Sequence, residues 1–339
     1  EWVGNDVPRL TYDPVTLQPL GLLVEEQRTN LIRHSANLAN VAWPRGAGVS
    51  ISTDGQLAPD GTPMQLITLA GTTNHNINQV LLAPLATGQA HTISVYVKPK
   101  SAPFPFQIAY YDGNSSLNSV LITPQPGVIQ RIAFTFTPTV VAASPQIRIL
   151  GFSSGGDGDQ VYIWGAQLEA GAFPTSYIPT EASQVTRAAD MATVDTLSPW
   201  YNATEGALVV RFVLGQPGVS TLNQHAAAFS DGGFNNYLAI RKQANTTIRG
   251  QSVVAGDVQA DITSGAAAAS TMKVAFSYKA DSFALSQNGS VAVTDLTGTL
   301  PVVDRLDIGR LSGAGQYLNG TIASLEYYPR VIDVQQASA

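Results

Sequence analysis

The sequence contains no cysteine at all, which excludes a disulfide framework, a thiolate metal site and a cysteine nucleophile. Charged residues are also scarce, at 12% of the chain with a net charge of −6. Because surfaces that bind nucleic-acid phosphates are rich in Lys and Arg, nucleic acid is not expected as a partner. The apolar residues form short interrupted runs, below the roughly 18 consecutive residues that span a bilayer, so we expect no membrane insertion. Stability must therefore come from the burial of apolar side chains.

Short segments rich in β-branched and aromatic residues recur along the whole chain, separated by Gly, Pro, Asn and Asp. In one of them, Ile93, Val95 and Val97 alternate with more polar residues, which is typical of a strand with one face in a core. The spacing of these segments is that of two antiparallel sheets packed face to face. The sequence thus predicts an all-β chain with two antiparallel β-sandwich (jelly-roll) domains in tandem.

Prolines near the start of the sequence predict a first segment without a long helix. Pro8, Pro14 and Pro19 forbid a long helix in residues 1–30, which we expect to form an extended N-terminal arm with one short strand. The apolar run Leu20–Val24 in this arm needs a covering surface, either the following domain or a neighbouring chain. The remaining boundaries that we expect are 31–180 for the first sandwich, 181–203 for a connector and 204–339 for the second sandwich.

Two stretches resemble known families. WGAQLEAGAFPTSYIPT (164–180), followed by VTRAAD (185–190) and preceded far upstream by RTNL (28–31), resembles a signature of bacteriophage tail-fibre and related virion proteins. In those proteins it ends a jelly roll similar to carbohydrate-binding modules. The stretches 273–296, 306–310 and 318–332, with Asn288-Gly289 and Ile308-Gly309, resemble the second half of a concanavalin-A-like domain of the laminin-G type, and the segment covers about residues 204–335. The resemblance implies a virion protein on the tail or capsid surface, acting outside the cell beside other virion proteins.

Two clusters combine aromatic rings with amide and carboxylate groups, which is the composition of glycan-binding surfaces. If a strand alternates, one aromatic residue of each cluster must face the core, so core packing or subunit contact is the alternative for both clusters. The glycan-binding candidates are Tyr110, Tyr111, Asp112 and Asn114 in the first sandwich, and Phe234, Asn235, Asn236 and Tyr237 in the second.

Metal ligands are few. The four histidines lack the close spacing of a metal site. Oxygen-rich loops are candidates for calcium at Asp157 and Asp159 in the first sandwich and at Asp231 in the second, with a plain solvated turn as the alternative at each. No other cofactor is expected.

The function that we predict from the sequence is that of a non-enzymatic fibre or spike component of a virion, which adheres to host surface polysaccharide. The structural alternative is a decoration or connector protein that packs only against other virion proteins. A polysaccharide-degrading enzyme is the third alternative, although the predicted strands of the second sandwich contain no Glu-x-Glu or Asp-x-Glu pair. We also expect a homo-oligomer, with the trimer implied by the resemblance to fibre proteins and the arm as its contact.

Overall fold

The computed structural model describes the chain except for residues 1–6, 13–17, 72–74, 101, 114–116, 151–154, 216–222, 245–246, 267–270 and 312–314. The described residues form two compact units, one of residues 28–187 and one that joins residues 2–27 to residues 188–339. Strands make up almost all of the regular structure, and α1 (Val334–Ser338) is the only helix among the described residues. None of their helices is long and apolar enough to cross a membrane. The prediction of an all-β fold with two antiparallel β-sandwiches is confirmed.

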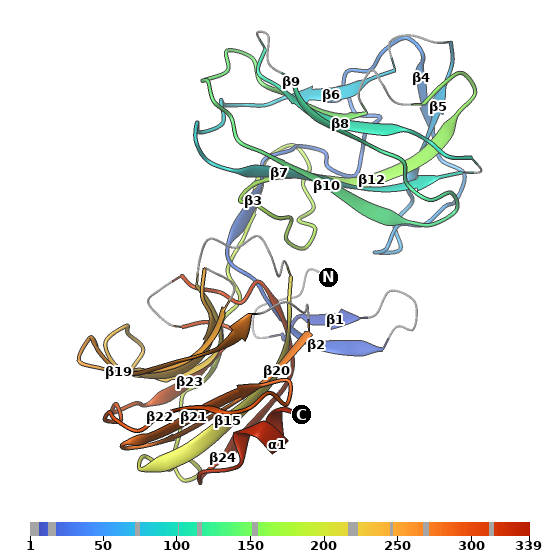
Figure 1. The fold of residues 1–339 in the computed structure, drawn as a ribbon. Coiled ribbons are helices and arrows are strands. Elements are labelled where there is room, and N and C mark those ends of the chain that lie inside the picture. Colours follow the sequence, from blue (N-terminus) through green and yellow to red (C-terminus); the bar gives the residue numbers. More distant parts are fainter. Residues whose placement is uncertain are drawn as a thin grey trace. The chain divides into compact units, whose positions relative to one another are not determined.

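The first unit is a β-sandwich of a five-stranded sheet, in the order β10-β7-β12-β5-β4, and a four-stranded sheet, in the order β6-β11-β8-β9 (Figure 1). A separate pair, β3 and β13, joins the two ends of the unit. Its strands are β3 (Arg28–Asn30), β4 (Val49–Ser52), β5 (Gln65–Leu69), β6 (Ile77–Val80), β7 (His91–Pro99), β8 (Phe106–Tyr111), β9 (Leu117–Ile122), β10 (Gln130–Phe136), β11 (Gln146–Leu150), β12 (Gln160–Ala170) and β13 (Val185–Arg187).

Alternation along the strands places the core of this unit between its two sheets. Ile93, Val95 and Val97 of β7 are completely buried. Ile132 and Phe134 of β10 lie directly opposite Val95 and Ile93, so they extend the same apolar face across the sheet. The other face of each strand points away from this core.

Buried polar side chains connect the beginning and the end of the first unit through hydrogen bonds. Asn30, which is 0% exposed, donates to the carbonyls of Ala166 (3.2 Å) and Ile178 (2.9 Å) and accepts from the amides of Ile32 and Leu168 (both 3.1 Å). Two of these bonds tie the first strand of the unit to β12, and a third ties it to Ile178 in the segment that follows β12. The part of the sequence that resembles fibre proteins therefore has a structural role.

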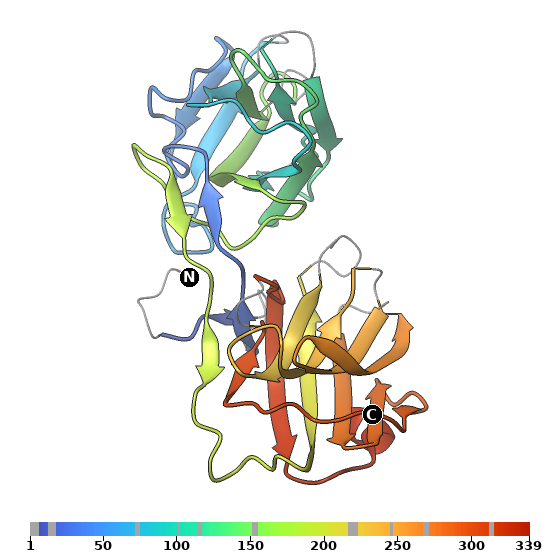
Figure 2. The same ribbon diagram turned by 90° about the vertical axis from the view of Figure 1, so that its left-hand side faces the viewer.

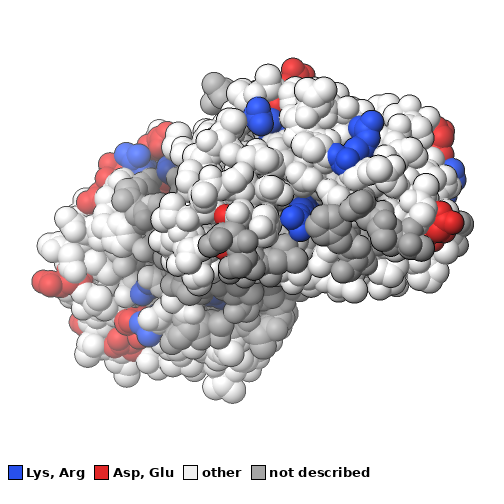
Figure 3. Space-filling model, turned by 90° about the horizontal axis from the view of Figure 1, so that it is seen from above, with Lys and Arg blue, Asp and Glu red and all other residues white. Residues whose placement is uncertain are grey.

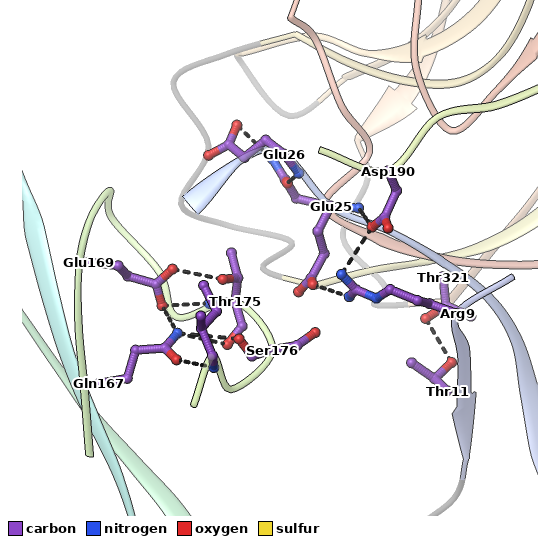
Figure 4. Close-up of polar contacts among 12 residues, drawn as sticks. Arg9, Thr11, Glu25, Glu26, Gln167, Glu169, Thr175, Ser176, Asp190 and Thr321 are labelled. Atoms are coloured by element: carbon purple, nitrogen blue, oxygen red, sulfur yellow. Dashed lines mark hydrogen bonds and ion pairs between the residues drawn. The ribbon is translucent and has the colours of Figure 1, made fainter. Parts of the chain in front are cut away.

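A second buried group stabilises the same region. The carboxylate of Glu169 accepts from the backbone amide of Thr175 (2.8 Å), from the hydroxyl of Thr175 (2.7 Å) and from the side-chain amide of Gln167 (2.7 Å), as Figure 4 shows. Since an unpartnered buried carboxylate is costly, these donors determine how the segment after β12 folds back on the sheet.

The second unit is also a β-sandwich. A seven-stranded sheet, β1-β2-β24-β15-β20-β21-β22, packs against a six-stranded sheet, β14-β23-β16-β17-β18-β19. Its strands are β1 (Leu10–Tyr12), β2 (Pro19–Val24), β14 (Ala192–Val194), β15 (Glu205–Leu214), β16 (Gln224–Ser230), β17 (Tyr237–Lys242), β18 (Thr247–Val254), β19 (Asp257–Ala266), β20 (Thr271–Lys279), β21 (Ser282–Gln287), β22 (Val293–Asp295), β23 (Arg305–Ile308) and β24 (Gly320–Tyr328).

The N-terminal segment belongs to this second sandwich, whereas the sequence led us to expect an arm of its own. Strands β1 and β2 form a hairpin, and β2 pairs with β24 from Leu22 to Val24 (Figure 2, blue beside red). The physical reason is the apolar run of β2, which is covered by the edge of the sheet in the same chain. Gly21, with φ +138°, allows the close approach, because a Cβ there would lie 2.2 Å from the carbonyl oxygen of Ile322.

Ion pairs anchor the end of this hairpin. Arg9 forms ion pairs with the carboxylates of Glu25 and Asp190, and the backbone amide of Glu25 donates to Asp190 at 2.8 Å (Figure 4). The side chains of Arg9 and Glu25 are 9% and 10% exposed. Solvent therefore screens these ion pairs less than it screens ion pairs on the surface.

Candidate functional site

The outer face of the four-stranded sheet in the first unit carries polar side chains around one aromatic ring. Arg148 of β11 lies over the ring of Tyr111 at the end of β8, with its guanidinium carbon 4.9 Å from the ring centre. Gln146 lies directly opposite Tyr111, and Asn78 of β6 lies directly opposite Arg148. All four side chains are half-buried, so the surface is in contact with solvent and already ordered. Burial also lowers the pKa of Arg148, while Tyr111 acts in the opposite direction.

Only part of the first cluster of glycan-binding candidates lies on this surface. Tyr111 faces outward, whereas Tyr110 is 1% exposed and stacks on Phe136 in the core with ring centres 4.5 Å apart. Burial raises the pKa of Tyr110, with Asp112 as a second cause. Asp112 is 3% exposed, so it is not placed to meet a ligand from solvent. Asn114 lies outside the described residues. The alternation of β8 explains why only one ring of the pair reaches the surface.

The outer face of the six-stranded sheet in the second unit carries a row of basic side chains. His225 of β16 lies directly opposite Arg241 of β17, which in turn lies directly opposite Arg249 of β18. Arg249 is paired with Asp261 of β19. Opposite residues in antiparallel strands share a face, so these three side chains form one line across the sheet.

Tyr237 lies on the same face, and its hydroxyl donates to the side-chain oxygen of Gln251 at 2.7 Å. Tyr237 is only 6% exposed, whereas Phe234, whose ring centre is 6.1 Å away, is 40% exposed. Asn235 is exposed, and the side chain of Asn236 accepts from the amide of Ala255 at 3.0 Å. The second cluster therefore presents Phe234 and Asn235 to solvent, while Tyr237 and Asn236 support the sheet and its turn.

The three candidate calcium ligands accept hydrogen bonds from nearby groups, Asp159 and Asp231 within their own loops and Asp157 from a neighbouring loop. Asp157 accepts from the amide of Gly71 and Asp159 from that of Gly156, both at 2.7 Å. The two oxygens of Asp231 accept from the amide of Gly233 and from the side chain of Asn236, both at 2.8 Å. Within the described parts of the chain, no three His, Asp or Glu side chains are grouped as metal ligands. Calcium at these loops stays a prediction.

Two carboxylates on the outer face of the six-stranded sheet bear on the enzyme alternative. Asp307 of β23 accepts from the hydroxyl of Ser230 at 2.7 Å and pairs with Arg310 at 3.4 Å, while Asp261 pairs with Arg249. Four strand spacings separate β23 from β19, which amounts to about 19 Å. Glycosidases hold their two carboxyl groups about 5 to 9.5 Å apart. Asp261 and Asp307 are therefore too far apart to act on one glycosidic bond.

Four residues of the two candidate surfaces were not predicted from the sequence, namely Arg148, Arg241, Arg249 and Gln251. The signal was present, because Arg148 stands between Ile147 and Ile149, and an arginine between two apolar strand residues must face away from the core. On the face seen in Figure 3, most of the surface is neither basic nor acidic, and several of the basic side chains lie beside acidic ones.

Comparisons with known proteins give structural neighbours and no relatives in sequence. No family model matches the chain, and no curated protein matches it. Solved neighbours are carbohydrate-binding modules and a putative sugar binding protein. The Ruminococcus gnavus IT-sialidase CBM40 bound to alpha2,3 sialyllactose is 14% identical over 40% of this chain and 82% of that chain, with a TM-score of 0.34.

Two further neighbours are similarly distant. The CBM22-2 xylan-binding domain from Paenibacillus barcinonensis Xyn10C is 11% identical over 42% of this chain and 98% of that chain, with a TM-score of 0.32. A putative sugar binding protein from Bacteroides thetaiotaomicron VPI-5482 is 12% identical over 42% of this chain and all of that chain, also with a TM-score of 0.32. Similarities at this level carry no argument about what the present chain binds.

Proposed function

We propose that the chain is a non-catalytic glycan-binding protein, and that it attaches a virion fibre or spike to host surface polysaccharide. The observation that carries the glycan part of the proposal is the pair formed by Tyr111 and Arg148, with the amides of Asn78 and Gln146 directly opposite. A sugar ring places its C–H face against an aromatic ring, and its hydroxyls exchange hydrogen bonds with amide and guanidinium groups. The virion part follows from the resemblance of residues 28–31 and 164–190 to fibre proteins.

Removal of the aromatic ring tests this surface. We expect Tyr111→Ala to weaken binding to the recognised glycan roughly tenfold, because the contact area of one ring is worth about 1.5 kcal/mol. Tyr111→Phe keeps the ring and is expected to bind like the natural chain. A glycan array identifies the ligand, and calorimetry with that ligand measures the dissociation constants.

The matched control is Leu82→Ala, because Leu82 is a 61% exposed apolar residue of the same unit outside the Tyr111 surface. It is expected to leave binding unchanged. Failure of the natural chain to bind any host glycan would favour the structural alternative, a decoration or connector protein. Release of reducing ends from purified polysaccharide would favour the enzyme alternative.

We further propose that the chain acts as a homo-oligomer, a trimer by the resemblance to fibre proteins, since several copies on one axis raise the effective concentration for a surface glycan. The N-terminal hairpin offers the contact, because it keeps apolar side chains exposed after β2 has paired with β24. These are Val7 (53%), Leu10 (44%), Tyr12 (48%) and Leu20 (45%).

Sedimentation of the natural chain and of the double variant Leu10→Ser, Leu20→Ser tests the oligomer. We expect a trimer for the natural chain and a monomer for the variant. Point substitutions are preferable to truncation, because removal of the hairpin would also take β2 from its sheet. A monomeric natural chain would refute the proposal, and a variant that stays trimeric would place the contact elsewhere.

A further inference from the structure

Two arginines face each other on the outer face of the six-stranded sheet, but only one of them has a counter-ion. Arg241 and Arg249 are directly opposite on β17 and β18, where two like charges are unfavourable. Arg249 is paired with Asp261. Arg241 has no hydrogen bond or ion pair with any residue that the structure describes, and its Nε is buried without an acceptor.

Arg241 is also deeply placed, with 9% of the residue exposed. Burial lowers the pKa of Arg241; Tyr237 and Asp261 act in the opposite direction, and Arg249 adds to the lowering. Guanidinium nevertheless stays protonated in proteins, so Arg241 is a buried cation without a partner. Because a buried cation without a counter-ion is unfavourable, Arg241 is placed to bind an anion.

The neighbours of Arg241 restrict the chemistry of that anion. His225, opposite Arg241 on the other side, is 1% exposed. Gln251 lies two residues from Arg249 on the same face, and its oxygen already accepts from Tyr237, which leaves its amide group as a donor. The guanidinium of Arg241 and the amide group of Gln251 are therefore donors on the same face of the sheet.

We propose that Arg241 and Gln251 bind the carboxylate of an acidic saccharide, at a second glycan site separate from the Tyr111 surface. A carboxylate fits better than a phosphate, because one unpaired guanidinium balances a single negative charge and donates two parallel hydrogen bonds to it. The saccharide class rests on the proposed function of the chain as a glycan-binding protein. The exposed ring of Phe234 lies beside Tyr237 on the same unit and offers a stacking surface for the neutral part of such a ligand.

A glycan array with matched pairs tests the site, each pair consisting of a uronic-acid or sialic-acid glycan and its neutral counterpart. We expect the natural chain to prefer acidic members, and Arg241→Gln to reduce that preference at least about tenfold. Arg330→Gln, which removes the same charge from an exposed position of the same unit, is expected to leave the preference intact. Tyr111→Ala is also expected to leave it intact, so failure at the first surface and failure at this site remain distinguishable.

A stability measurement separates ligand binding from a structural role. If Arg241 is retained for a ligand, Arg241→Gln is expected to raise the thermal midpoint of the second unit in the absence of glycan, because the variant removes an unpaired buried charge. A lower midpoint would assign Arg241 a structural role and overturn the proposal. Equal binding of acidic and neutral glycans by the natural chain would also overturn it, as would an Arg241-dependent preference limited to sulfated glycans.

Discussion

Replacement of Asn30 by alanine is expected to lower the free energy of unfolding of the first unit by about 3 to 5 kcal/mol. The side chain is completely buried and makes four hydrogen bonds to the backbone. Alanine would leave two carbonyls and two amides without partners in a place that water does not reach, and each orphaned group costs about 1 to 3 kcal/mol. Urea titrations of the full chain, followed by hydrogen exchange in peptides from β7 and β12, would measure the change.

Two comparisons make this expectation specific. Gln89→Ala changes an exposed residue of the same unit and is expected to stay within about 0.5 kcal/mol of the natural chain. Asn30→Asp keeps the acceptor of the amides but places a buried carboxylate oxygen against two carbonyl oxygens, so a loss at least as large as that of Asn30→Ala is expected. A loss below about 1 kcal/mol in Asn30→Ala would contradict the assignment, because the bonds of Asn30 would then not be what ties β3 to β12 and to the segment after it.

Asn30 also shows what a resemblance in sequence conveys. The segments that resemble fibre proteins, residues 28–31 and 164–190, contact each other through Asn30, and Glu169 stabilises the turn at Thr175 within the second segment. Asn30, Glu169 and Thr175 are buried, so these residues maintain the jelly roll. A motif can therefore be sufficient to predict the fold of a unit while the surface that binds a partner lies elsewhere on the same unit.

The faces of single strands were predictable, but the surfaces that they build were not. Alternation assigns Tyr111 and Arg148 to outer faces, since their neighbours Tyr110 and Ile147 are apolar or aromatic core residues. Arg148 lies over Tyr111 because β11 pairs with β8. In the sequence, β9 and β10 stand between these two strands. Such pairing is set by the order of strands in the sheet, which no local pattern encodes.

The same limit applied to the N-terminal segment. Its apolar run Leu20–Val24 predicted that a surface must cover it, but the strand that pairs with the end of this run, β24, lies some 300 residues later in the chain (Leu22 opposite Ile322). The basic row of the second unit is another case, because His225, Arg241 and Arg249 come from three strands. Their convergence on one line became visible only with the register of the sheet.

Acid is expected to destabilise the second unit through one residue of that row, His225. Burial lowers the pKa of His225 to about 3, and Arg241 adds to the effect, whereas an unfolded chain has a histidine pKa of about 6.5. Because the folded pKa is the lower one, the unfolded state binds the proton first. The stability that neutral His225 contributes is therefore present above about pH 6.5 and is lost as the pH falls toward 3.

The expected slope is about 1.4 kcal/mol per pH unit, which amounts to roughly 3 kcal/mol between pH 7 and pH 4. The other three histidines, His34, His75 and His91, lie in the first unit, so between about pH 6.5 and 5, above the usual carboxyl range, His225 accounts for the slope of the second unit. Arg241 opposite the ring and Tyr237, whose ring centre is 6.3 Å away, are the ionisable groups that face it.

His225→Leu tests this assignment, because leucine fills a buried position of similar size and does not titrate. The variant is expected to lose the slope between pH 6.5 and 5 while the natural chain keeps it, as measured by urea titrations followed by hydrogen exchange in peptides from β15 and β20. Arg241→Gln is expected to leave a shallower slope, since removal of the neighbouring cation lets the pKa of His225 rise toward its ordinary value. An unchanged slope in His225→Leu would show that another group takes up the proton, and would remove His225 as the cause of acid sensitivity.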